Sequence, residues 1–218
     1  MALVFPLAAA NFLDLLPVQS VQFYCPPQVA ATGLAGGDVL RAEVAPALWQ
    51  GVFALPPMRP RLAGVFEVLI EALQGVGGSF HAYKKNQIGP ASDPRGLALA
   101  GRSIVIAQVD VAGSRLRLSG LPGGFVLSPG DFLAFDYGIA PVGRALHRLQ
   151  SGGVADGFGV SGWLWLTPHI EPGALTGAAV SLVRPACKAV IVPGSVDPGV
   201  TSGNLTTGAA FSFRQTFR

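Results

Sequence analysis

The chain has 218 residues, of which 50% are apolar and only 12% charged, and its formal net charge is +3 at pH 7. The charged share is about half that of an ordinary soluble domain. This length is enough for one large or two small domains with their own cores. The basic residues are thinly spread and are not interleaved with aromatic residues, which argues against nucleic-acid binding.

So little charge leaves much of the surface apolar. An apolar surface suits a chain whose faces are covered by neighbouring copies, although a β protein with many Gly and Pro turns explains the composition equally well. No run reaches the roughly 18 uninterrupted apolar residues of a membrane span, so we expect no membrane insertion. The opening MALVFPLAAAN lacks the basic region of a signal peptide and contains a proline, and a secreted β-sandwich is therefore only an alternative.

The first predicted elements are two strands and a helix. The segment 37–57, GDVLRAEVAPALWQGVFALPP, predicts a pair of extended segments. The segment 60–78, PRLAGVFEVLIEALQGVGG, predicts a helix near 61–74, with Pro60 in the first turn and Gly75 at its end. Its apolar residues recur at helical spacing and predict a face packed on a sheet: Leu62, Val65, Phe66, Leu69, Ile70 and Leu73.

The rest of the chain predicts strands and turns. Strands are expected within the segments 79–86, 102–121, 161–170, 179–194 and 208–218. Phe211 and Phe213 should share one strand face, with Arg214 on the other. The fold class is therefore mainly β, a β-sandwich or barrel with one flanking α-helix.

The segment SGWLWLTPHI, 161–170, is apolar on both faces and predicts a central, doubly covered strand. Trp163 and Trp165 are therefore expected to be buried. If they were exposed beside polar groups, the pair would suit a sugar-binding platform.

Two stretches rich in turn-forming residues, 86–101 and 194–208, are predicted to be joints between parts of the fold. They suggest a parent domain formed by residues 1–90 and 178–218, with an inserted β-domain at 91–177. The stretch LRLSGLPGGFVLSPGDFLAF within the insert holds two chain reversals, at 122–124 and 129–130, which would fix the directions of three strands.

No residue pattern predicts a catalytic, cofactor-binding or metal-binding site, and we expect no enzymatic activity. His81, His147 and His169 have no partner at metal-ligand spacing, and Cys25 and Cys187 are expected to be free thiols, with a disulfide left open. A hydrolase built from carboxylates remains an alternative. Its candidate residues are Asp131, Asp136, Asp156 and Glu171. Asp131, in the sequence SPGD, is expected to have a turn role instead.

The order of several loose motifs resembles the distal tail proteins, a family of minor tail proteins of long, flexible-tailed bacteriophages (siphophages). The motifs, in chain order, are VFPL, LWQGVFALPPM, LQGVGGSFHAY, GPASDPRGLALAG, LRLSGLPGGFVLSPGDFLAF, ALHRLQSGGVADGFGVSGWLWLTPHI and SLVRPACKAVI. The likeness covers nearly the whole chain. It departs from the family at His147, where an aromatic residue is common, and in the glycine-rich stretch after Pro193.

The resemblance implies a structural protein that forms a ring, expected to be a homohexamer, between the tail tube and the hub of the tail tip or baseplate. A tail-tube-like parent domain would surround the channel through which DNA passes, and an inserted β-barrel domain would project outward. The implied partners are other copies of the chain, the tail tube protein and the hub proteins, with no cofactor. The implied location is the virion tail, assembled in the host cytoplasm. The alternative is a carbohydrate-binding or host-attachment module of the tail tip.

Overall fold

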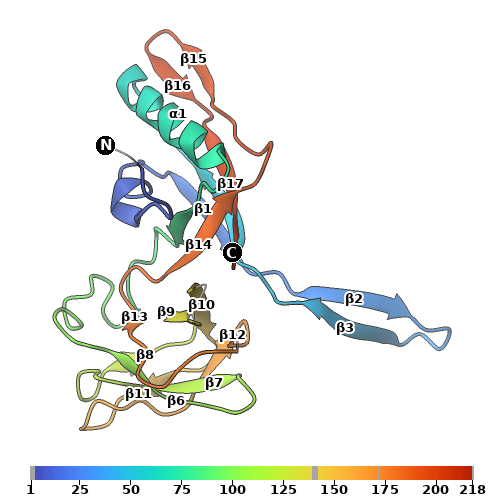
Figure 1. Ribbon diagram of the computed structural model, residues 1–218, viewed down its shortest axis with the longest axis vertical. Coiled ribbons are helices and arrows are strands. Elements are labelled where there is room, and N and C mark those ends of the chain that lie inside the picture. The colour runs from blue at the N-terminus through green and yellow to red at the C-terminus, as the bar shows by residue number, and fades with distance from the viewer. Residues whose placement is uncertain (1–2, 139–141, 171, 218) are drawn as a thin grey trace.

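The computed structural model describes residues 3–138, 142–170 and 172–217, and Figure 1 shows two β-rich parts and a projecting hairpin. Strands account for 40% of the chain, and the described residues contain a single α-helix. The prediction of a mainly β fold with one helix is confirmed. No helix among the described residues is long and apolar enough to cross a membrane.

The first sheet has five antiparallel strands in the order β1-β4-β17-β14-β5. Their bounds are β1 Ser20–Tyr24, β4 Gln50–Ala54, β17 Ala210–Gln215, β14 Ala186–Ile191 and β5 Phe80–Tyr83. Phe211 and Phe213 are buried on one face of β17 while Arg214 is exposed on the other, as the alternation predicted. Gly51 permits the close approach of β1, because a Cβ there would lie 1.8 Å from the carbonyl oxygen of Gln22.

The helix α1, Pro60–Gln74, covers the first sheet. Pro60 occupies the first turn, where its missing N–H costs no hydrogen bond, and Gly75 ends the helix in an extended conformation. Phe66, Ile70 and Leu73 are buried in a core shared with the phenylalanines of the sheet. We refer to this cluster as the first core. The predicted helix is therefore confirmed. Its predicted packing face is confirmed in part, because Leu62 and Leu69 are only half-buried and Val65 is exposed.

The second sheet has six strands in the order β13-β9-β10-β12-β7-β6. Their bounds are β13 Val180–Ser181, β9 Phe132–Tyr137, β10 Gly143–Leu149, β12 Leu164–Thr167, β7 Arg115–Ser119 and β6 Val105–Val109. A second, separate core lies within this sheet and includes Leu116, Leu133, Phe135 and Leu164. A short pair, β8 Val126–Leu127 with β11 Gly153–Val154, lies beside it. The last strand, β13, lies just beyond the end of the insert expected from the sequence.

The doubly covered strands of the second sheet are β9 and β10, not the segment 161–170. Leu133 and Phe135 of β9 belong to the second core, whereas Phe132 and Ala134 belong to the first. On β12, Leu164 and Leu166 are buried, but Trp165 is 45% exposed and Trp163 is half-buried. The prediction that the tryptophan pair is buried is wrong, because an apolar strand face is covered only if another layer lies against it.

The turns of the segment 116–135 follow its glycines and prolines. The Phe125 N–H donates to the Pro122 carbonyl at 3.0 Å, and the Asp131 N–H donates to the Ser128 carbonyl at 3.1 Å. Gly124 and Gly130 adopt φ of 75° and 94°, a region that side chains with a Cβ disfavour. These are the two reversals predicted at 122–124 and 129–130.

Two further hairpins are present, and of their four strands only Val39–Ala45 falls within the extended segments predicted at 37–57. β2, Gln28–Gly33, pairs with β3, Val39–Ala45, and this hairpin projects from the body (Figure 1). β15, Val200–Ser202, pairs with β16, Leu205–Thr207, inside the stretch read as turns alone. Thr206 and Met58 exchange backbone hydrogen bonds of 2.8 Å in each direction, which holds β16 beside the start of α1. A short 3₁₀ turn, Ala9–Asn11, completes the elements of the described residues.

Candidate functional site

Asp131, the first of the four carboxylate candidates, has the turn role that the sequence predicted. Its side chain is 1% exposed. One carboxylate oxygen accepts the Ser128 N–H at 2.8 Å, and the other accepts the Ala91 N–H at 2.8 Å. The carboxylate therefore fastens the turn to the loop that leads into the second sheet.

The remaining carboxylates are also engaged in local structure where they are described. Asp136 forms an ion pair with Arg144 at 2.9 Å, and Asp156 accepts the Val160 N–H at 2.9 Å within a turn. Glu171 lies outside the described residues. Within the described parts of the chain, no three His, Cys, Asp or Glu side chains gather to hold a metal ion.

His147 is buried in the second sheet with only one of its ring nitrogens satisfied. Nδ1 lies 2.9 Å from the Pro168 carbonyl oxygen, which can only accept, so Nδ1 carries the proton. Nε2 has no hydrogen-bond partner among the described residues, and the ring stacks on Phe135 at 5.3 Å. Burial lowers the pKa of His147 to about 4, because the charged imidazolium would lose its hydration.

This buried histidine predicts acid sensitivity. The unfolded chain binds a proton at His147 near pH 6.5, whereas the folded chain does so only near pH 4. Stability should therefore fall as the pH is lowered across this window, by about 3 kcal/mol from this group. Urea denaturation at several pH values should show the fall, and His147→Phe should reduce it. The pKa of His81 is also lowered by burial, so a smaller slope should persist. For each protein, the free energy of unfolding is compared with its own value at pH 8. If it falls as steeply with decreasing pH in His147→Phe as in the parent, the assignment to His147 is wrong.

The two cysteines are free thiols, as predicted, with Cys25 half-buried and Cys187 buried. Burial raises the pKa of Cys25 to about 11 and that of Cys187 to about 12. Because the thiolate is the reactive form, neither side chain is poised as a nucleophile at neutral pH.

Two surface features stand out instead, and the first is a patch of alternating tryptophan and arginine. Trp165 of β12 lies opposite Arg115 of β7 in the strand register. The Arg115 guanidinium lies 5.3 Å from the Trp165 ring centre and 4.9 Å from that of Trp163, and Arg117 lies 5.8 Å from Trp163. We name Trp163, Trp165, Arg115 and Arg117 the Trp–Arg patch. Arg115 also donates a hydrogen bond through Nε to Asp110, and Arg117 donates one through Nε to the Ser161 carbonyl. The arginine side chains are thereby held in place against the tryptophan rings.

The second feature is one face of the β2–β3 hairpin. The register pairs Ala30 with Ala42 and Thr32 with Leu40, and partners in register point to the same side of a sheet. We name these four residues the hairpin apolar face. All four are exposed, Leu40 by 60%. The alternation was not recognised in the sequence because Ala, Thr and Gly dominate β2 and give a weak strand signal.

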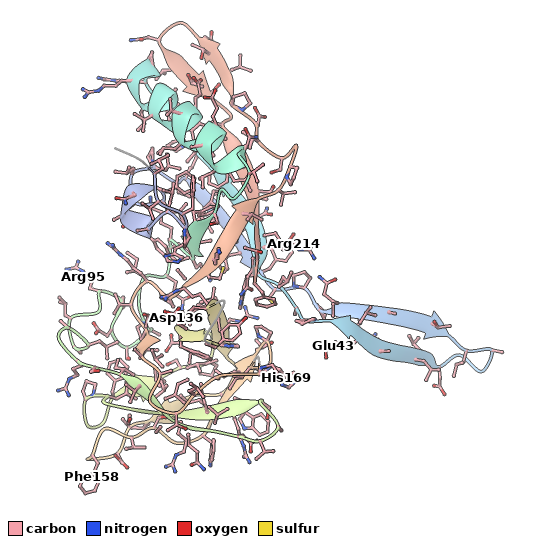
Figure 2. All side chains as sticks on the ribbon, in the orientation of Figure 1. Glu43, Arg95, Asp136, Phe158, His169 and Arg214 are labelled. Carbon is pink, nitrogen blue, oxygen red and sulfur yellow. The ribbon has the colours of Figure 1, made fainter. Side chains whose placement is uncertain are left out.

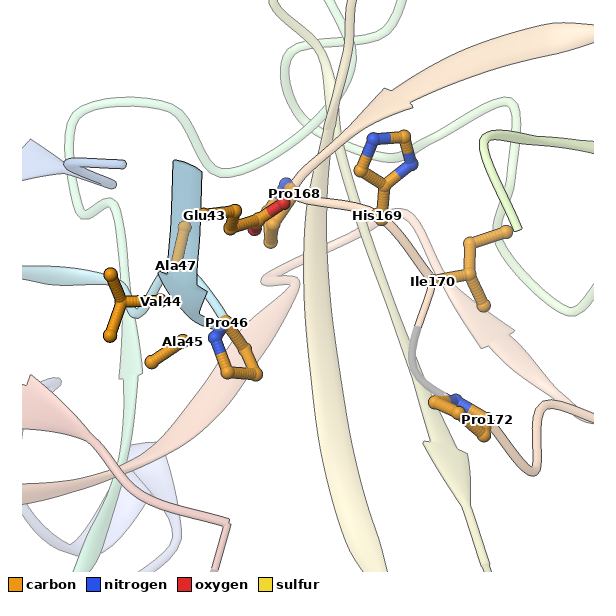
Figure 3. Close-up of a pocket in the computed structure, with 9 residues that line it drawn as sticks. All are labelled: Glu43, Val44, Ala45, Pro46, Ala47, Pro168, His169, Ile170 and Pro172. Atoms are coloured by element: carbon orange, nitrogen blue, oxygen red, sulfur yellow. The ribbon is translucent and has the colours of Figure 1, made fainter. Parts of the chain in front are cut away.

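A crevice runs between the root of this hairpin and the loop that follows β12. One part has a volume of 410 Å³ and is lined by 43–47 on one side and by Pro168, His169, Ile170 and Pro172 on the other (Figure 3). An adjoining part of 320 Å³ shares Glu43, Ala47, Pro168 and His169 and reaches Trp165. Figure 2 shows Glu43 near the hairpin root and His169 on the facing part of the molecule. No local sequence pattern predicts this crevice, because its two walls lie more than a hundred residues apart in the chain.

Compared with models of known protein families and with curated proteins, the chain matches none.

Proposed function

We propose that this chain is a ring-forming structural protein of a phage tail, joining the tail tube to the tip hub, and that it has no enzymatic activity. The proposed assembly is a homohexamer whose channel DNA crosses. The neighbouring partners are the tail tube and hub proteins, and the location is the virion tail after assembly in the host cytoplasm. The motif order given above is the source of this proposal, and the observation that carries it is the uncovered hairpin.

The hairpin supports self-association because it lacks a core of its own. A two-stranded hairpin alone is only marginally stable in water, and its apolar face gains nothing until another surface covers it. Every residue of β3 is exposed, including Leu40 of the hairpin apolar face at 60%. The described part of the chain does not cover this face, and a second copy is the partner we assign to it.

We assign the hairpin a head-to-tail contact, which builds a ring rather than a symmetric dimer. A projecting arm that packs on a different surface of the next copy makes a head-to-tail contact, and such contacts close into rings when the rotation is favourable. The first sheet also leaves β1 at its edge, with Ser20, Gln22 and Tyr24 exposed. A free strand edge is tolerated when a neighbour covers it.

Native mass spectrometry and electron microscopy of the purified chain test the proposal. We expect a closed ring of defined mass, six times that of the chain, with a central channel. A monomer at every concentration, or an open-ended polymer, would contradict the proposed ring.

The second candidate function is a carbohydrate-binding or host-attachment role. It is favoured by the Trp–Arg patch, since Trp165 is exposed rather than buried and lies beside polar groups. The two functions are compatible, because the patch and the hairpin apolar face are different surfaces.

A further inference from the structure

We propose that the crevice between the hairpin root and the loop after β12 is a binding site for a neutral oligosaccharide, with Trp165 as its stacking platform. This inference gives the second candidate function a site and a ligand class, and it rests on that function. It does not require the ring.

The crevice has the dimensions and lining of a ligand site. Its two adjoining parts, 410 Å³ and 320 Å³, fall within the range of roughly 300–1,000 Å³ that small-molecule sites occupy. Prolines and alanines supply apolar walls, among them Pro27, Ala47 and Pro168. A sugar ring has apolar C–H faces and a polar rim, so it needs a site with both kinds of surface.

Trp165 provides an aromatic face that is fixed in place. Its backbone N–H donates to the Ser151 hydroxyl at 3.0 Å, and its carbonyl accepts the Gln150 N–H at 2.8 Å. The Arg115 guanidinium, 5.3 Å from the ring centre, packs on the indole and is itself held by Asp110 at 3.0 Å. The ring is nevertheless 45% exposed and lines the crevice, so a ligand would meet a pre-ordered platform.

The polar groups around this platform select hydroxyl-rich ligands. Ser114, Gln150 and Thr167 offer uncharged donors and acceptors, and His169 offers an imidazole. Among the described residues that line the crevice, Glu43 supplies a carboxylate, and its side chain points across it towards Pro168 and His169 (Figure 3). No ion pair engages Glu43 among the described residues. This carboxylate accepts hydroxyl hydrogens and repels an acidic sugar, so we assign a neutral ligand class.

The test is a titration of the full-length protein with maltohexaose, cellohexaose, mannohexaose and chitohexaose, followed by tryptophan fluorescence and calorimetry. We expect saturable binding of at least one of them, with a Kd of roughly 0.1–1 mM. Trp165→Ala should weaken that binding by about tenfold or more, and Glu43→Gln should weaken it severalfold. Both side chains lie at the surface, so the melting temperature should stay close to that of the parent protein.

Phe158→Ala is the matched control, because Phe158 is a 93% exposed aromatic residue outside the crevice lining, and it should bind as the parent protein does. Absence of saturable binding across the panel, or unchanged binding by Trp165→Ala, would overturn the inference. The inference would also be overturned if the parent protein bound no sugar and the Trp165→Ala variant no longer assembled. The crevice would then be a contact between copies. Native mass of the parent protein reports on the ring separately, so failure of one proposal is distinguishable from failure of the other.

Discussion

Trp49→Ala should abolish cooperative folding or leave the protein close to its unfolding threshold. Trp49 is fully buried in the first core, where its ring lies 5.4 Å from those of Phe23 and Phe132. Its Nε1–H donates at 2.6 Å to the carbonyl oxygen of Leu146, in the second sheet. Trp49 immediately precedes β4, so its side chain ties the start of that strand in the first sheet to β9 and β10 of the second.

The expected loss of folding stability is large because two energetic costs add. Truncating a buried Trp to Ala costs about 3–5 kcal/mol, and an orphaned buried carbonyl costs about 1–3 kcal/mol more. The whole stability of a domain is about 5–15 kcal/mol. Urea denaturation followed by circular dichroism measures the effect without relying on the tryptophan removed.

Trp49→Phe is the matched variant, since it keeps an aromatic ring but removes the N–H donor. It should lose less stability than Trp49→Ala, with the hydrogen bond to Leu146 accounting for part of the deficit. Trp165→Ala, a truncation of an exposed tryptophan, should be nearly neutral for stability. A Trp49→Ala protein as stable as the Trp165→Ala protein would show that Trp49 does not join the two sheets.

The double variant Leu40→Glu/Ala42→Glu should convert the ring to monomers without unfolding the chain. Both residues are exposed on the hairpin apolar face, so the free monomer can hydrate the new carboxylates. In an assembly, the same carboxylates would be buried against the next copy without partners, at a cost of several kcal/mol per interface. Mass photometry across a concentration series measures the shift.

Val111→Glu supplies the matched control, because Val111 is a fully exposed apolar residue in the turn between β6 and β7. It adds a surface charge without touching the hairpin, and the mass of its assembly should equal that of the parent. If the hairpin variant still forms the parent ring, the hairpin is not the arm that joins the copies.

The helix and most strands could be predicted because their signals are local. The signals that define α1, from Pro60 through the apolar stripe to Gly75, lie within sixteen residues of sequence. Glycine and proline mark the reversals at 122–124 and 129–130. The backbone conformation at such positions is set by the local residues and does not depend on what packs nearby.

The surfaces could not be predicted, because burial depends on which strand another layer covers. The apolar run around Trp163 and Trp165 resembles a central strand, yet β9 and β10 are the strands that lie between the two cores. The same limit applies to β2 and to β15–β16, whose Ala, Thr and Gly residues give weak strand signals, whereas β3 lies within the predicted segment 37–57. The crevice at Glu43 and His169 exists only because the fold brings distant segments together.

Electron microscopy of intact particles, with this chain located by its side-chain density, tests the central claim most directly. We predict a closed ring of copies at the junction of tail tube and tip, with the hairpin apolar face of each copy packed on its neighbour. Purified virions that lack the chain would contradict a structural role in the tail, and its presence there as isolated copies would contradict the ring.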